Sequence, residues 1–204
     1  MNKEKMIRTA RGLDTLFKTL RRIIVIAMAA AVCVMAVLTV VHWVNPAAVI
    51  GEGFESLDLG TVTVELAPES APTAGEVLGY AWLVIALGSV CAALIWYIFG
   101  QIRQILAPMK EGTPFQASVS QSIRRMAWVS LALGAAQNIG RMIEVNAVIG
   151  RFDINQLLAS GQIRSITANY TLDMTFVLVF FGLRLVSYIF RYGEELQQLS
   201  DETL

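Results

Sequence analysis

Four long apolar stretches alternate with polar segments along the chain. They cover residues 23–44, 77–100, 126–149 and 174–190. Each approaches or exceeds the length of about 20 residues that an α-helix needs to cross a hydrocarbon core about 30 Å thick. The pattern predicts an all-α integral membrane protein in which all 204 residues form one four-helix bundle.

The N-terminal segment, residues 1–22, has a different pattern. Apolar side chains recur there at helical spacing, while Lys and Arg occupy the other positions. This pattern predicts an amphipathic helix that lies on the cytoplasmic leaflet, with its cations near anionic lipid. The alternative is a docking helix for a partner protein.

The two outer loops carry weaker signals. In the first loop, residues 45–76, positions 61–66 alternate between polar and apolar types. Such alternation is typical of a half-buried strand, so we expect a short strand or hairpin at the outer end of the bundle. In the second loop, residues 150–173, we expect a short interfacial helix over residues 153–167, broken at Gly161.

The cytoplasmic loop, residues 101–125, contains two turn signals. These are Ala107-Pro108 and Gly112-Thr113-Pro114-Phe115. Ser118 or Ser120 is then expected to cap a helix that runs into the third apolar stretch.

Charge is distributed unevenly, although the formal net charge is 0. Seven Lys and Arg precede the first apolar stretch, four occupy residues 101–125, and Arg191 begins the tail, residues 191–204. Residues 45–76 contain six Asp and Glu and no Lys or Arg. Because basic residues are retained on the cytoplasmic side during insertion, we expect both termini and the loop 101–125 to be cytoplasmic.

The third apolar stretch is chemically unusual. It carries polar or small residues at alternating spacings of 4 and 3, which places them on one helix face: Ser130, Gly134, Gln137, Arg141, Glu144 and Val148. In the fourth stretch, Arg184 and Ser187 share a face that Arg191 continues toward the cytoplasm. We call Ser130, Gln137, Arg141, Glu144, Arg184 and Ser187 the polar seam.

Two interpretations of the polar seam stay open. Ionisable groups inside membranes often mark ligand or ion sites, so the seam is a candidate hydrated pocket or relay. The alternative is a buried polar network that sets helix register, and we favour it slightly because no acidic group lies at mid-depth. We expect Arg184 to contact Gln137 or backbone carbonyls, and to reach Glu144 only through water or a helix offset.

Other chemistry is excluded or disfavoured. Cys33, Cys91 and His42 have no zinc or redox spacing, and no metal-ligand cluster, nucleophile with a base, or phosphate-binding glycine loop occurs. We therefore expect no cofactor, no metal and no enzymatic activity. Direct nucleic-acid binding is not expected either, because membrane sidedness accounts for the basic residues.

Two short motifs lie in the segments expected to be cytoplasmic. One is Gly112-Thr113-Pro114-Phe115 followed by Ile123-Arg124-Arg125, and the other begins at Tyr192-Gly193-Glu194-Glu195-Leu196-Gln197. Together they resemble the motifs of a bacterial domain-of-unknown-function family of small four-helix inner-membrane proteins. The family is frequently encoded beside a short helix-turn-helix regulator, and it has no assigned activity. The resemblance implies a bacterial inner-membrane location and a soluble regulator as partner. In the simpler interpretation, the first motif is a turn and Gly193 ends the fourth helix.

Two functional hypotheses follow. The first is a regulatory or sensory membrane protein that binds a soluble partner on its cytoplasmic face. The expected partner surface comprises Gly112, Pro114, Phe115, Arg124, Arg125, Tyr192, Gly193 and Leu196. The alternative is a small transporter or channel subunit that uses the polar seam, with a homo-oligomer supplying further helices.

Overall fold

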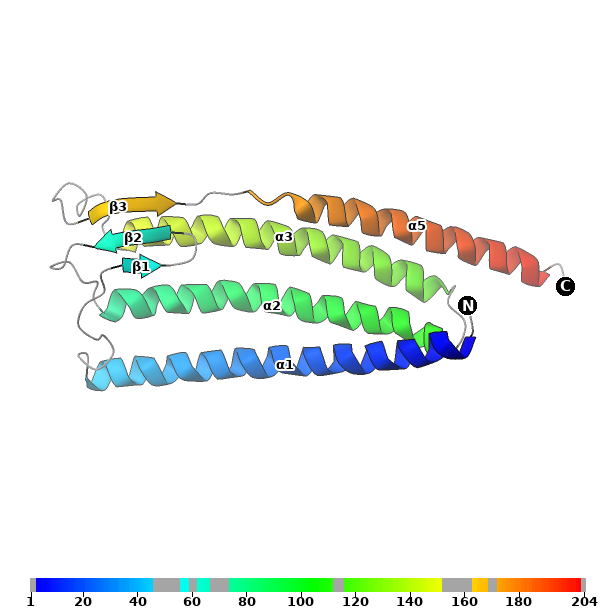
Figure 1. The fold of residues 1–204 in the computed structure, drawn as a ribbon, viewed down its shortest axis with the longest axis horizontal. Helices are drawn as coiled ribbons and strands as arrows, with labels where there is room; N and C mark the ends of the chain where they lie inside the picture. The colour runs from blue at the N-terminus through cyan, green and yellow to red at the C-terminus, as the bar shows by residue number, and fades with distance from the viewer. Residues whose placement is uncertain are drawn as a thin grey trace. The chain divides into compact units, whose positions relative to one another are not determined.

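The described residues form four long helices and three short strands (Figure 1). The computed structural model describes residues 3–45, 56–58, 62–66, 74–111, 116–151, 163–168 and 172–202, and the statements below concern these residues. The helices are α1 (Lys3–Val44), α2 (Ala74–Glu111), α3 (Ala117–Arg151) and α5 (Thr175–Glu202). The strands are β1 (Ser56–Asp58), β2 (Val62–Leu66) and β3 (Ile163–Ala168).

The helices confirm the expectation of a helical protein suited to a membrane. Among the described residues, three segments are long and apolar enough to cross one: Ile7–Val44, Gly75–Glu111 and Thr175–Leu199. α3 has 35 residues and is also long enough, but charged residues such as Arg141 and Glu144 interrupt its apolar surface. A crossing by α3, and with it the four-span topology, stays a prediction.

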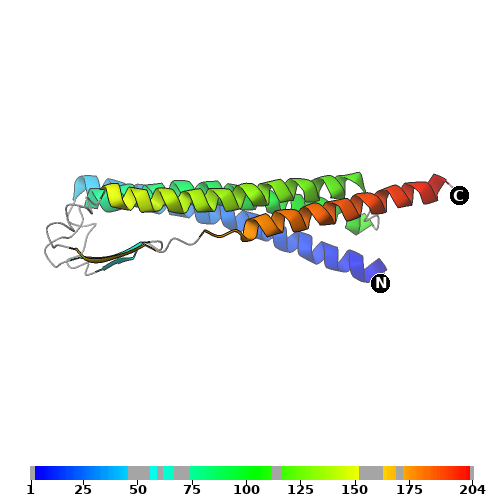
Figure 2. The same ribbon diagram turned by 90° about the horizontal axis from the view of Figure 1, so that it is seen from above.

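α1 is one continuous helix of 42 residues (Figures 1 and 2). The structure therefore does not support a separate amphipathic helix over residues 1–22. No proline or glycine occurs between Leu13 and Val44, so nothing in the sequence ends the helix where the apolar stretch begins. Contacts with α2, described below, also hold the N-terminal half of α1 in place.

α2 and α5 continue past two residues that were expected to interrupt them. Pro108 lies inside α2, so the prediction of a turn at Ala107-Pro108 is wrong. Proline removes one backbone hydrogen bond there, but Arg103 and Lys110 on either side of it are both tied to α1. α5 runs through Gly193, where glycine lowers helix stability by about 1 kcal/mol relative to alanine without ending the helix.

α3 begins at Ala117, directly after Gln116, whose carbonyl accepts a hydrogen bond from the Val119 amide at 2.9 Å. Ser118 and Ser120 lie inside the helix, so neither is the residue that caps it. The expected turn at Gly112-Thr113-Pro114-Phe115 lies outside the described residues.

The strands form one antiparallel sheet in the order β1-β2-β3. Leu57 pairs with Val64, and Val64 pairs with Ile166, so the central strand β2 joins the segment before α2 to the segment before α5. The helix expected over residues 153–167 is wrong from Ile163 onward, where β3 begins. β-branched residues favour an extended chain in that segment, and β2 supplies the backbone partners that a helix would otherwise supply internally.

The chain divides into two compact units that carry opposite charge. The first comprises Met1–Ala27, Cys91–Ala136 and Asp173–Leu204, and the second comprises Met28–Val90 and Gln137–Leu172. The first has 13 Lys and Arg against 8 Asp and Glu, a formal charge of +5, and we call it the basic unit. The second has 3 against 8, a formal charge of −5, and we call it the acidic unit. Both termini belong to the basic unit, and the sheet belongs to the acidic unit.

Candidate functional site

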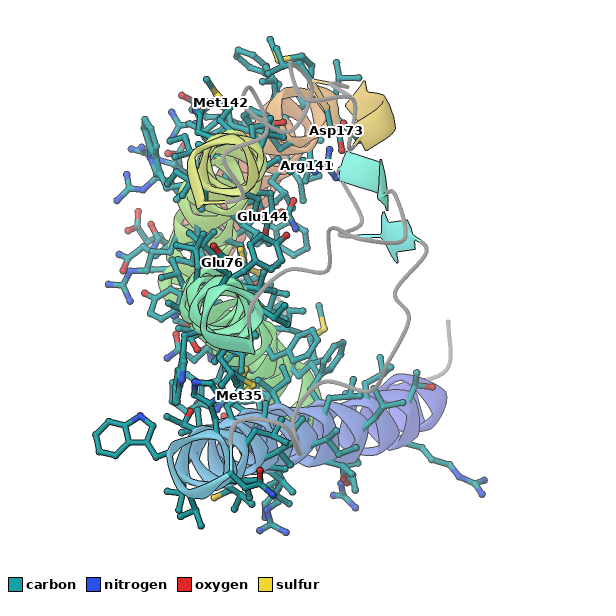
Figure 3. All side chains as sticks on the ribbon, turned by 90° about the vertical axis from the view of Figure 1, so that its left-hand side faces the viewer. Met35, Glu76, Arg141, Met142, Glu144 and Asp173 are labelled. Carbon is teal, nitrogen blue, oxygen red and sulfur yellow. The ribbon has the colours of Figure 1, made fainter. Side chains whose placement is uncertain are left out.

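Several polar residues of the acidic unit lie on α2 and α3. Tyr80 on α2 is buried, and Glu144 on α3 is half-buried. Figure 3 shows Glu76 and Glu144 on the sides of α2 and α3 that face each other. Tyr80, Glu76 and Glu144 all have polar or electrostatic partners, as does Arg141.

The structure places the polar seam in two parts. Gln137, Arg141 and Glu144 belong to the acidic unit, and the other three members belong to the basic unit. Arg141 and Gln137 are exposed, whereas Glu144 is half-buried. A contact between Arg184 and Gln137 stays a prediction; the hydrogen bond seen for Arg184 runs to the Tyr188 hydroxyl, at 2.9 Å within α5.

In the basic unit, Asp14 of α1 binds two cations of α2. Its carboxylate accepts hydrogen bonds from Arg103 Nε at 2.8 Å and from Lys110 Nζ at 2.5 Å. These bonds, first from Lys110 and then from Arg103, hold the pKa of Asp14 below its ordinary value of 3.8. The interaction ties α1 to the C-terminal end of α2.

Aromatic contacts extend the same α1–α2 interface. The Phe17 and Phe99 rings lie 5.4 Å apart between centroids, and the Arg21 guanidinium lies 3.7 Å from the centre of the Trp96 ring. Arg21 also lies beside Gly100. Stacking on an aromatic face stabilises a guanidinium that is partly removed from water, so the start of the first apolar stretch can tolerate this cation.

α3 and α5 approach closely within the basic unit. The Ser187 hydroxyl donates a hydrogen bond to the Ser120 carbonyl at 2.9 Å, and Ser187 is buried. Gly134 lies against Phe176 with no room for a Cβ atom. Trp128 and Phe180 pack edge to face at 5.1 Å. Small residues at a helix interface allow such close approach.

A cavity of about 300 Å³ opens between the N-terminal part of α3 and α5, and we call it the basic pocket. It brings together two seam residues, Arg184 and Ser187, with Arg124 of the expected partner surface. Spacing along α5 indicated that Arg191 shares their face, but no sequence pattern predicted that Arg124 and the other lining residues of α3 would lie against it. The full lining is Ala117, Ser120, Gln121, Arg124, Arg184, Ser187, Tyr188, Arg191 and Glu194.

The expected partner surface is only partly described. Gly112, Pro114 and Phe115 lie outside the described residues, and Arg125 is exposed beside the pocket-lining Arg124. On α5, Tyr192 is 64% exposed and Leu196 is 50% exposed, while Gly193 between them is half-buried. Tyr192 and Leu196 continue a row of exposed apolar residues at spacings of 4, 3 and 4 that starts at Leu185 and Ile189.

No His, Cys, Asp or Glu group among the described residues has the arrangement needed to hold a metal ion. Cys33 and Cys91 are free thiols. No family model, curated protein or solved structure matches this chain. The fold therefore defines the class, a helical protein whose helices are suited to a bilayer, and the resemblance to a bacterial family stays a prediction.

Proposed function

We propose that this chain is a multi-pass protein of a bacterial inner membrane that acts in regulation or sensing through a soluble cytoplasmic partner. In this proposal both termini, which belong to the basic unit, lie on the cytoplasmic side. The charge difference between the two units supports that orientation, because Lys and Arg accumulate on the cytoplasmic side during insertion.

The observation that carries the proposal is the apolar face of α5 beyond Arg191. Tyr192 and Leu196 are at least half exposed and lie past a cation that is suited to the membrane interface. Leu196 lies five residues after Arg191, which is about 7.5 Å further along the helix. If Arg191 marks the interface, the side chain of Leu196 lies outside the lipid. In water that side chain would have no packing partner.

The geometry favours an amphipathic helix of a partner protein as the occupant of this face. Apolar residues spaced alternately by 4 and 3 form the seam by which one helix packs along another. Completing the burial of a half-exposed leucine contributes about 1 kcal/mol. The family resemblance suggests that the partner is a short helix-turn-helix regulator.

α1, α2 and α3 supply a route by which binding on one side could be sensed on the other. Each is an unbroken helix with residues in both units. A continuous helix transmits a shift or rotation along its length better than a loop does, because its backbone hydrogen bonds resist local bending.

Photocrosslinking in intact cells tests the proposal. A crosslinking amino acid replaces Leu196 in one variant and the exposed polar neighbour Gln197 in the matched control. We expect a crosslink to a soluble protein from position 196, weaker from 197, and lost when Tyr192 is replaced by a polar residue. Crosslinks from position 196 only to lipid, or only to a second copy of this chain, would refute a soluble partner.

A further inference from the structure

The basic pocket concentrates positive charge in a small volume. Arg124 approaches it from α3, and Arg184 and Arg191 approach it from α5. Glu194 is the one acidic residue among the nine that line it. Three guanidinium groups around about 300 Å³ repel one another, and an anion inside the cavity would relieve that repulsion.

The contacts seen for Arg184 and Arg191 neutralise their charge only weakly. Arg184 donates its hydrogen bond to the uncharged hydroxyl of Tyr188, and its guanidinium carbon lies 5.3 Å from the centre of that ring. Arg191 pairs with Glu195 at 3.3 Å, but the two side chains are 67% and 58% exposed. An ion pair so accessible to water is weak, so Arg191 remains available to a stronger acceptor.

The uncharged lining adds further polar groups. Ser187 and Ser120 come together at the hydrogen bond that joins α5 to α3, and Gln121 contributes an exposed amide. Ala117 lies at the start of α3, where the helix dipole has its positive end. The lining therefore suits an anion that accepts several hydrogen bonds at once.

We propose that the basic pocket binds a phosphate group, carried by an anionic phospholipid headgroup or by a small soluble phosphate ester. Guanidinium groups bind phosphate through paired N–H···O bonds, and a tetrahedral phosphate can accept from donors that converge from different directions. The volume lies at the lower end of the range for ligand pockets, which fits a headgroup rather than a whole lipid. Basic pockets between membrane helices on the cytoplasmic side are known to hold such headgroups.

Binding there would connect α3 to α5. Arg124 belongs to one helix and Arg184 and Arg191 to the other, so a phosphate that contacts all three spans the same interface as the Ser187–Ser120 hydrogen bond. Occupancy is therefore expected to stabilise the packing of α5 on α3, independently of any soluble partner.

Native mass spectrometry of the purified full chain in detergent tests the lipid source. Phosphatidylglycerol is titrated against zwitterionic phosphatidylcholine, and the variants are R124Q, R124K and the matched control R125Q. Arg125 is the neighbouring exposed arginine that does not line the pocket. Because R124Q removes charged hydrogen-bond donors to the phosphate, we expect it to weaken phosphatidylglycerol binding about tenfold or more. R124K should restore part of the lost affinity, and R125Q should change the affinity for phosphatidylglycerol less than about twofold.

A second arm uses glycerol 3-phosphate and inorganic phosphate, with binding followed by calorimetry on the same variants. Binding of either compound with the same loss in R124Q would support the pocket and identify a soluble source. Unfolding curves without ligand check that R124Q is folded. The proposal is overturned if phosphatidylglycerol and phosphatidylcholine bind equally and neither soluble phosphate binds, or if R124Q and R125Q lose the same affinity.

Discussion

Replacing Asp14 with asparagine should destabilise the basic unit measurably. The carboxylate accepts from both Arg103 and Lys110, and asparagine keeps the size of the side chain but removes its charge. The two cations of α2 would then face each other without the anion that separates them. The change tests whether α1 is held against the end of α2 by this interaction.

The expected loss follows from the exposure of the three side chains. They are 18% exposed for Asp14, 32% for Arg103 and 28% for Lys110. A fully exposed pair would contribute about 0–1 kcal/mol, and a hydrogen bond to a charged group about 1.5–3 kcal/mol. The three side chains are only partly exposed, so the energy of their interaction should lie between these limits. We expect D14N to lower the free energy of unfolding by about 2 kcal/mol.

Unfolding of the full chain in mixed detergent micelles measures this quantity, and E195Q is the matched control. Glu195 also loses an arginine partner when it is neutralised, but that pair lies one turn apart on an exposed helix surface. E195Q should therefore change the unfolding free energy by less than about 0.5 kcal/mol. Equal effects of D14N and E195Q would contradict the assignment of Asp14 as an interhelical anchor.

The dependence on pH provides a second check. Asp14 precedes the apolar stretch that begins at residue 23, and its pKa is lowered in the folded state. The contribution of the ionised Asp14 to folding stability is complete above the ordinary carboxyl pKa of 3.8. It is lost as the pH falls through the lowered pKa of the folded state. The difference between wild type and D14N should therefore shrink below about pH 4. A difference that persists unchanged into strong acid would refute the electrostatic explanation.

Two further substitutions test the helix interfaces. G134A should cost about 1–3 kcal/mol in the same unfolding assay, because its new methyl group overlaps Phe176, whereas G182A, which meets nothing within 4 Å, should be neutral or stabilising. T39V removes the oxygen that accepts from Trp82 Nε1 at 3.1 Å, and it should cost about 0.6–1 kcal/mol. T15V loses only a hydrogen bond to its own helix and should change the unfolding free energy less; an equal loss would contradict a role for the Trp82 contact.

Hydropathy predicted where the helices lie but not where they end. The stretch at residues 77–100 marks the apolar part of α2, and α2 continues to Glu111. The extension mixes polar and apolar residues: Leu106 is buried, and Arg103 and Lys110 form ion pairs with Asp14 of α1. The end of a continuous apolar stretch therefore does not mark the end of a helix whose last turns contain both kinds of residue.

Non-local pairing limited the other predictions. The alternation at residues 61–66 is a local signal that predicts the strand β2 itself. One of the two strands that pair with β2 is β3, which lies about a hundred residues later in the chain, so no local pattern predicts this pairing. The basic pocket depends in the same way on α3 and α5 together. Spacing placed Arg184, Ser187 and Arg191 on one face, but which helix covers that face depends on packing between helices.

The aromatic and cationic residues along α1 and α2 suggest where the hydrocarbon core ends. On α1, Arg21 packs on Trp96, and His42 lies near Gly75 of α2, so polar or amphipathic groups mark both positions. The separation of Arg21 and His42 along the helix is 21 residues, or about 32 Å, which matches the thickness of a hydrocarbon core. Asp14 then lies about 10 Å beyond the boundary at Arg21, where water screens its ion pairs in part. We therefore expect added salt to reduce the destabilisation caused by D14N but not that caused by T39V, because Thr39 lies inside the boundary and its hydrogen bond to Trp82 is uncharged.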